Sequence, residues 1–210
     1  MIALIHGYGT GRSLARSART HGGFQAFEGA IIANEAKVFF WFTLSKDKKI
    51  QNFNPLFHLS LYLSERERAK NYKTLENFNN FLLQNSITHI VAHSLGCYLV
   101  MNYLQFFELP DFVHRISFIQ ADFSQDDFLI SSSLQKRLFT KKMYWVNYYC
   151  PWDNALICSF TIHHTPPVGL VGWKSEFIIN KLFPLWKRIN LHTSSINDEK
   201  LFIDTITAIP

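Results

Sequence analysis

Short runs of consecutive apolar residues alternate along this chain with longer stretches in which apolar positions recur every three or four residues. Apolar runs without polar alternation are typical of strands buried on both faces, as in a parallel sheet. Six such runs predict strands at residues 2–6, 37–43, 87–92, 115–120, 143–149 and 186–191.

Helical periodicity fills the stretches between these runs. Leu75, Phe78 and Leu82 are spaced three and four residues apart and define one apolar helix face. The predicted helices span residues 11–20, 64–83, 95–107 and 197–208. Strands that alternate with helices predict an α/β fold, with a mostly parallel sheet of about six strands and helices on both faces. With no repeat and no linker, residues 1–210 are expected to form one domain.

The charge balance is mild and argues against nucleic acid as a partner. Lysine and arginine total 21 against 16 acidic residues, a formal charge of +5. The basic residues form short clusters without interleaved aromatic side chains, whereas a nucleic-acid groove combines the two. Solvated loop ends are the simpler interpretation of these clusters.

Compartment and assembly are predicted from what the sequence lacks. No apolar run reaches the roughly 18 residues of a membrane helix, so we expect no stable membrane insertion. The first residues have no basic segment or cleavage site, which argues against a signal peptide. Cys97, Cys150 and Cys158 are too few for a disulfide framework or a zinc site. A cytoplasmic monomer or weak homodimer without metal or organic cofactor is expected.

The most informative motif joins the predicted strand at 87–92 to the helix that follows it. Ala92-x-Ser94-x-Gly96 places a serine between small residues in a strand–turn–helix context. A sharp turn of this kind holds the serine hydroxyl clear of the sheet, where it can act as a nucleophile. The backbone N–H of Leu95 would then face a tetrahedral oxyanion. A serine that merely caps the helix is the structural alternative.

A second motif follows the first strand. His6-Gly7-Tyr8-Gly9 lets the backbone bend, so that the N–H of Tyr8 would be the second oxyanion donor, with His6 as a structural support of the loop. An ordinary turn at the end of a strand is the alternative. The pair of motifs in this order is much more specific than either motif alone.

Taken together, the two motifs resemble the α/β-hydrolase fold of lipases and esterases, and more closely a family of uncharacterised serine hydrolases within it. The resemblance covers most of the chain and also includes the aromatic strand 40–42, Gln120-Ala121-Asp122 and the Tyr-Tyr-x-x-x-Asp-x-Ala-Leu stretch at 148–156. Because the first strand starts at the chain's beginning, the resemblance implies a minimal sheet that lacks the two leading strands of the usual eight.

The resemblance implies a chain order of nucleophile, acid and base. Asp153 follows the run at 143–149 and is the favoured acid, with Asp122, after the preceding strand, as its rival. His192 follows the run at 186–191 and is the favoured base, while His163 and His164 remain as other candidates. Adjacent histidines without further ligands at metal spacing are a weak metal signal.

These residues predict a serine esterase with a Ser94–His192–Asp153 triad and a small-molecule substrate. Loops at 123–142 and 154–184 are expected to act as small lids, and Trp152 and Trp173 to line an apolar pocket. Esters with short to medium acyl chains suit such a pocket. Lactones, thioesters or amides as substrates, and a non-catalytic binding scaffold, are the alternatives.

Overall fold

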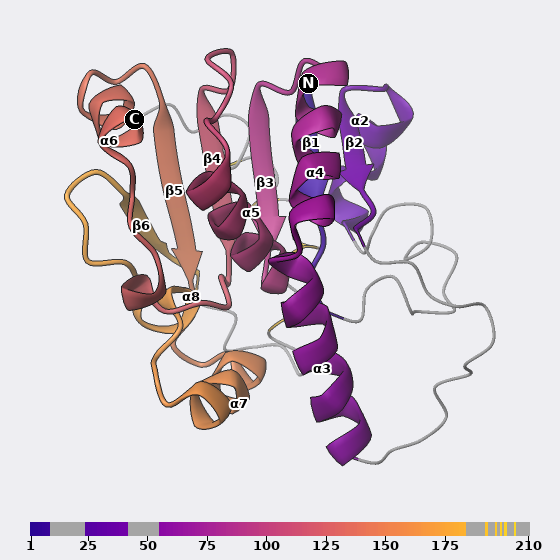
Figure 1. Cartoon of the computed structure of the whole chain (residues 1–210), viewed down its shortest axis with the longest axis vertical. Coiled ribbons are helices and arrows are strands. Elements are labelled where there is room, and N and C mark those ends of the chain that lie inside the picture. The colour runs from indigo at the N-terminus through magenta and orange to yellow at the C-terminus, as the bar shows by residue number, and fades with distance from the viewer. Residues whose placement is uncertain are drawn as a thin grey trace.

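The computed structural model describes residues 1–8, 24–41 and 55–183, and the single residues 192, 196, 198, 200 and 204. Six strands form one all-parallel sheet in the order β2-β1-β3-β4-β5-β6 (Figure 1). The strands are β1 (Ile2–Ile5), β2 (Ala36–Phe39), β3 (His89–His93), β4 (Arg115–Ile119), β5 (Tyr144–Tyr149) and β6 (Ile179–Leu182). The predicted α/β class and the six-stranded parallel sheet are confirmed.

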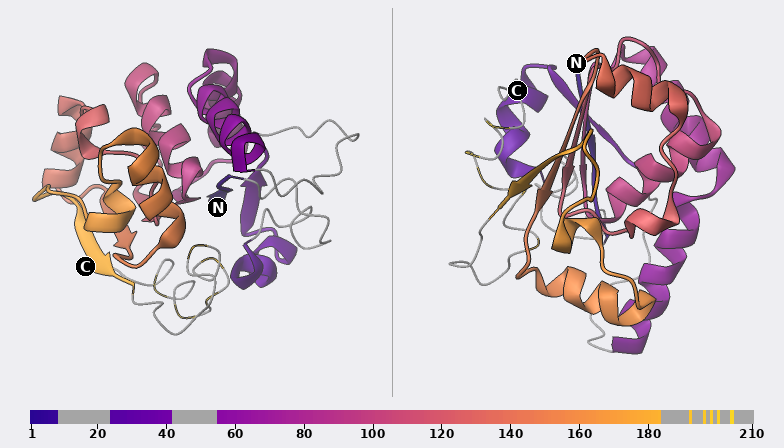
Figure 2. Two further views of the ribbon diagram at one scale, coloured as in Figure 1. Left: turned by 90° about the horizontal axis from the view of Figure 1, so that it is seen from below. Right: turned by 90° about the vertical axis from the view of Figure 1, so that its left-hand side faces the viewer.

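The described helices cover both faces of this sheet unequally. They are α2 (Glu28–Ile32), α3 (Pro55–Ala69), α4 (Tyr72–Gln84), α5 (Leu95–Phe106), α6 (Ser132–Phe139), α7 (Asn154–His163) and α8 (Val168–Val171), with single 3₁₀ turns η2 (Gln25–Phe27) and η3 (Gln125–Asp127). Figure 2 shows α2 on one face and α4, α5 and α6 on the other. Helix α7 and the lower part of α3 lie beyond the carboxyl ends of the strands (Figure 1).

The sixth strand differs from its prediction. The strand that pairs with β5 is β6, at Ile179–Leu182. The predicted strand at 186–191 and the predicted helix at 11–20 lie outside the described residues, and so does most of the predicted helix at 197–208. The expected lid loop 154–184 therefore contains two helices and a sheet strand. The expected lid loop 123–142 contains η3 and α6.

The helix predicted over 64–83 is two helices. The chain leaves helical geometry at Asn71, whose φ of −68° and ψ of 127° are extended, and its side chain accepts a hydrogen bond from the Lys73 N–H. Asparagine is among the best N-cap residues because it satisfies an otherwise unpaired amide of the first turn. Periodicity alone did not predict this break, because it continues across the junction.

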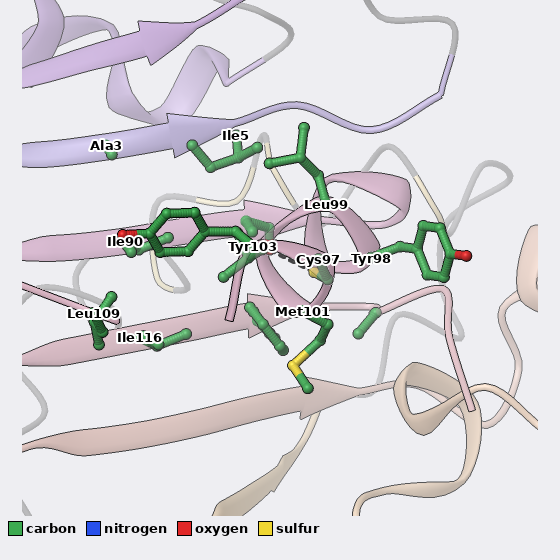
Figure 3. Close-up of a cluster of buried hydrophobic side chains, with 14 of the residues drawn as sticks. Ala3, Ile5, Ile90, Cys97, Tyr98, Leu99, Met101, Tyr103, Leu109 and Ile116 are labelled. Atoms are coloured by element: carbon green, nitrogen blue, oxygen red, sulfur yellow. Dashed lines mark hydrogen bonds between the residues drawn. The ribbon is translucent and has the colours of Figure 1, made fainter. Parts of the chain in front are cut away.

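The centre of the sheet is buried on both sides. Every residue of β3 and β4 is buried, including the polar residues His89, His93, Arg115 and Ser117, which agrees with the lack of regular polar alternation in these runs. On the α5 face, Leu99, Met101 and Tyr103 pack against side chains of β1, β3 and β4 (Figure 3). The opposite face has a smaller cluster around Leu4, Val91 and residues near α2. The central strands are therefore held firmly between helices.

One glycine sets the distance between α5 and β1. A Cβ atom at Gly96 would lie 2.5 Å from the Ile5 carbonyl oxygen and 2.7 Å from that of His6. Both contacts are with backbone, which cannot rotate away as a side chain could. Only glycine permits this approach, as the sequence predicted for the second residue after Ser94.

We predict that Gly96→Ala lowers the free energy of unfolding by about 1–3 kcal/mol, because the added methyl group forces α5 away from β1. Gly29→Ala is the control, since its Cβ would meet no atom within 4 Å. In the short helix α2, that change should raise stability by up to about 1 kcal/mol. Urea unfolding followed by tryptophan fluorescence measures both, and a Gly96→Ala protein as stable as the wild type would contradict the prediction.

Candidate functional site

The predicted site residues gather at the carboxyl ends of β1 and β3. The strand order reverses between these two neighbours, since β2 lies beyond β1 while β4, β5 and β6 lie beyond β3. Loops that leave adjacent strands in opposite directions open a crevice, which is where open α/β sheets bind ligands. Gly7 and Tyr8 follow β1, and Ser94 follows β3.

Ser94 sits in a strained turn between β3 and α5. Its φ of 53° and ψ of −124° belong to a region that residues with a Cβ rarely adopt, at a cost of order 1–3 kcal/mol. The side chain makes no capping hydrogen bond to α5. Instead its Oγ lies 2.7 Å from His192 Nε2. The helix-cap alternative for Ser94 is therefore wrong.

Asp153 is the carboxylate beside His192. Its Oδ2 lies 2.7 Å from His192 Nδ1, and its side chain is fully buried. Its Oδ1 accepts the backbone N–H groups of Ala155 and Leu156 at the start of α7. One carboxylate thus caps a helix with one oxygen and holds the histidine with the other.

Asp122, the rival acid, is bound elsewhere. It accepts hydrogen bonds from the hydroxyl groups of Tyr62 and Ser159. Of the other candidate bases, His163 contacts Tyr62 through Nε2, and His164 is the residue that ends α7. Of the candidate acids and bases, the structure brings Asp153 and His192 together beside Ser94.

Two residues that sequence reasoning did not assign hold Asp153 and His192 in place. Gln120 follows β4 with a φ of 49° and donates from Nε2 to Asp153 Oδ2 at 2.5 Å. His93 donates from Nε2 to the His192 carbonyl oxygen at 2.8 Å, and the two rings lie 4.7 Å apart. Both residues belong to motifs that the sequence analysis recognised, but nothing in the sequence indicated their partners.

The predicted oxyanion donors lie beside Ser94. A Cβ on Gly7 would come within 2.7 Å of Ser94 Cβ, so the backbone that leads to Tyr8 passes directly over the serine. Leu95 begins α5 immediately after it. Below this turn His6 is buried, with its ring stacked on Trp41 and its carbonyl bonded to the Trp41 indole N–H at 3.1 Å. Its role as a support of the loop agrees with these contacts.

A cavity of about 410 Å³ opens onto Ser94 and His192. Tyr8, α3 and α7 supply most of its other lining residues, and much of that lining is apolar. The apolar side chains are Leu59, Ala155, Leu156 and Ile162. The segment predicted as a lid therefore contributes a cavity wall through α7.

The two tryptophans predicted to line the pocket do not line this cavity. Trp173 is only 6% exposed and packs against Phe118, Phe123 and Trp145 in the core. Trp152 is 64% exposed and is not among the residues that form the cavity wall. The prediction that these two residues line the pocket is therefore wrong for this cavity: the ring of Trp173 packs in the core, and that of Trp152 faces solvent.

No group of three or more His, Cys, Asp or Glu side chains within the described residues is arranged to hold a metal ion. Across that same part of the chain, no helix is long and apolar enough to cross a membrane. Comparisons of the chain with protein-family models, with curated proteins and with solved structures gave no match.

Burial keeps the histidines around the site neutral. Desolvation lowers the pKa of His6 to about 4 and that of His93 to about 3, against a usual value of 6.5, and the nearby His192 lowers the latter further. Below pH 6.5 the unfolded chain therefore binds protons that the folded chain does not. By linkage, stability must fall as the pH drops from about 6.5 towards 4 and level off above that window.

We predict a loss of about 1.4 kcal/mol of unfolding free energy per pH unit for each such histidine across this window. His93→Asn should make the dependence shallower, while His114→Asn, at an exposed position, should leave it unchanged. Urea unfolding at pH 7.5, 6 and 5 gives the slope of unfolding free energy against pH for the wild type and for each variant. Equal slopes for wild type and His93→Asn would contradict the prediction.

Proposed function

We propose that this chain is a serine hydrolase of the α/β-hydrolase type that cleaves carboxylic esters through an acyl-enzyme. One observation carries the proposal: His192 lies 2.7 Å from both Ser94 Oγ and Asp153 Oδ2, through opposite ring nitrogens. The strained backbone of Ser94 belongs to the same geometry. A structural serine needs neither feature.

The reaction follows from these contacts. With its proton on Nδ1, His192 donates to Asp153 and accepts the Ser94 hydroxyl proton at Nε2 as Oγ attacks the ester carbonyl. The N–H groups of Leu95 and Tyr8 receive the developing oxyanion. Collapse expels the alcohol, which takes the proton from Nε2 and leaves an acyl group on Ser94. Water then repeats the sequence and releases the acid.

Asp153 orients the His192 ring and stabilises the imidazolium that each step forms. Its own charge is supported by three N–H donors, from Ala155, Leu156 and Gln120. These donors are fixed by the fold, so no reorganisation is needed when charge develops. Preorganised dipoles in a site closed to water are the largest contribution in many enzymes.

The order of the three residues supports the α/β-hydrolase assignment. Ser94 follows β3, Asp153 follows β5 and His192 comes last, which is the order that the sequence resemblance implies. The six-stranded parallel sheet is consistent with a minimal form of that fold. A cavity of about 410 Å³ suits acyl groups of modest length, and lactones, thioesters or amides would use the same chemistry.

The three cysteines are free thiols, which suits a reducing compartment and supports a cytoplasmic location for this activity. A non-catalytic scaffold is the alternative function. A fluorophosphonate probe separates the two, since it labels only a serine that its neighbours have activated.

We predict that the wild type is labelled by a fluorophosphonate and hydrolyses p-nitrophenyl butanoate, and that Ser94→Ala loses labelling and at least about 10⁴-fold in kcat. Ser133→Ala, at an exposed serine of α6, should behave as the wild type. Steady-state kinetics and mass spectrometry of the labelled peptide are the measurements. An unlabelled wild type without esterase activity would favour the scaffold.

The acid is tested by Asp153→Asn, which should lower kcat about 10⁴-fold because an amide cannot hold the required His192 tautomer. Asparagine also caps helices well, so α7 should keep its start and the protein its fold. Asp126→Asn, an exposed residue in the loop after β4, is the control. If Asp153→Asn kept more than a tenth of the wild-type kcat with an intact circular dichroism spectrum, Asp153 would not be the acid.

A further inference from the structure

One wall of the cavity is polar, although most of the lining around it is apolar. Tyr62 from α3, Asp122 from the loop after β4 and Ser159 from α7 meet there, and all three line the same cavity as Ser94. The triad uses none of them. Asp122 is a carboxylate only 4% exposed, and burial of an ionised group requires compensating partners.

Hydroxyl groups supply those partners. Asp122 Oδ2 accepts the Tyr62 hydroxyl proton at 2.8 Å, and Oδ1 accepts the proton of Ser159. Each hydroxyl has one proton and uses it here, whereas each carboxylate oxygen keeps a second lone pair. Towards the cavity, these three side chains can therefore accept hydrogen bonds but have no proton left to donate.

The wall is also negatively charged. The nearest described cation is Arg66, which donates to the Asp122 backbone oxygen at 3.2 Å and to the Tyr62 hydroxyl at 3.5 Å, and forms an ion pair with Asp127 at 3.6 Å. Arg66 thus pairs with the Asp127 carboxylate, whereas its hydrogen bond to Asp122 is made to the backbone oxygen. His163, next to Tyr62, adds little positive charge, because burial and the Arg66 charge lower its pKa. Burial and the Asp122 charge raise the pKa of Tyr62, which keeps its proton.

This charge lies close to the reacting serine. The Asp122 N–H donates to the Ser94 carbonyl oxygen at 3.3 Å, so the two backbones are in contact. The Asp122 carboxylate therefore lies no farther from the Ser94 turn than the length of one aspartate side chain allows. A group that binds Asp122 must be near the carbonyl that Ser94 attacks.

We propose that Asp122 binds a protonated amine on the substrate, close to the scissile carbonyl, so that the enzyme prefers cationic esters to neutral or anionic esters of the same shape. An ammonium group has three N–H donors and no acceptor, which complements a wall of acceptors. This inference rests on the proposed esterase function. If Asp122 served only to tie α3 and α7 together, substrate charge would not affect the rate.

Esters of matched shape test the preference, since CH₃ and NH₃⁺, or CH and NH⁺, differ little in size. For an amine on the acyl side, benzyl β-alaninate is compared with benzyl butanoate, and with monobenzyl succinate as the anionic member. For an amine on the alcohol side, 2-(dimethylamino)ethyl butanoate is compared with 3-methylbutyl butanoate. We expect kcat/KM to be about tenfold or more higher for the cationic member of one pair, and the succinate to be the slowest acyl-side substrate.

Two variants connect any preference to Asp122. Asp122→Asn keeps the size of the side chain and removes the charge, so the cation-to-neutral ratio should fall to near one. Asp126→Asn removes a charge four residues along the same loop, at an exposed position outside the cavity lining, and should keep the wild-type ratio. If the cation-to-neutral ratio of kcat/KM fell equally in Asp122→Asn and Asp126→Asn, the proposed role of Asp122 would be wrong.

The wild-type protein is decisive even if Asp122→Asn does not fold. Ratios near one in both ester pairs, with Ser94-dependent turnover intact, would refute the amine site and leave the esterase proposal standing. If no ester is hydrolysed, the esterase proposal fails. Calorimetric binding to Ser94→Ala then tests the site alone, and tighter binding of benzyl β-alaninate than of benzyl butanoate would support it, while equal binding would refute it.

Discussion

The site depends on the close approach of the turn after β3 to the end of β1. Gly96 lets α5 pack onto the carbonyl groups of Ile5 and His6, and Gly7 lets the chain after β1 pass over Ser94. With larger residues at these two positions the turn would move off the sheet. Ser94 could then relax from its positive φ, and its hydroxyl would no longer be aimed at His192. Two glycines far apart in the sequence therefore hold Ser94 in its strained conformation beside His192.

The acid extends this constraint to the cavity wall. Because Asp153 both caps α7 and bonds His192, the helix that lines the cavity is fixed relative to the histidine that would act on the substrate. Asp122 provides a second connection, between α7 through Ser159 and α3 through Tyr62. The cavity is thus shaped by two buried carboxylates whose hydrogen bonds span several elements. Buried carboxylates are costly unless fully bonded, so each also restricts the positions that α7 can take.

The histidines close to His192 have a different task from the one that we propose for His192. His6 and His93 are buried and stay neutral over most of the pH range, so they add no charge that would oppose an imidazolium at His192. His93 also binds the His192 carbonyl oxygen, which anchors the base to the strand that carries the serine. The same burial makes the fold sensitive to acid, because protonation favours the unfolded chain.

Local sequence determined the parts of this protein that depend on short-range geometry. Short, mostly apolar runs predicted five of the six strands, and the spacing of Ala92, Ser94 and Gly96 predicted the turn, since steric limits on a strand–helix junction act within a few residues. Tertiary structure alone decided which carboxylate meets His192, and that Trp173 packs in the core. Asp153 and Asp122 both follow strands, and only the packing of α3 and α7 directs one to the histidine and the other to two hydroxyl groups. Such contacts join residues dozens of positions apart, and their energies depend on burial that no local pattern contains.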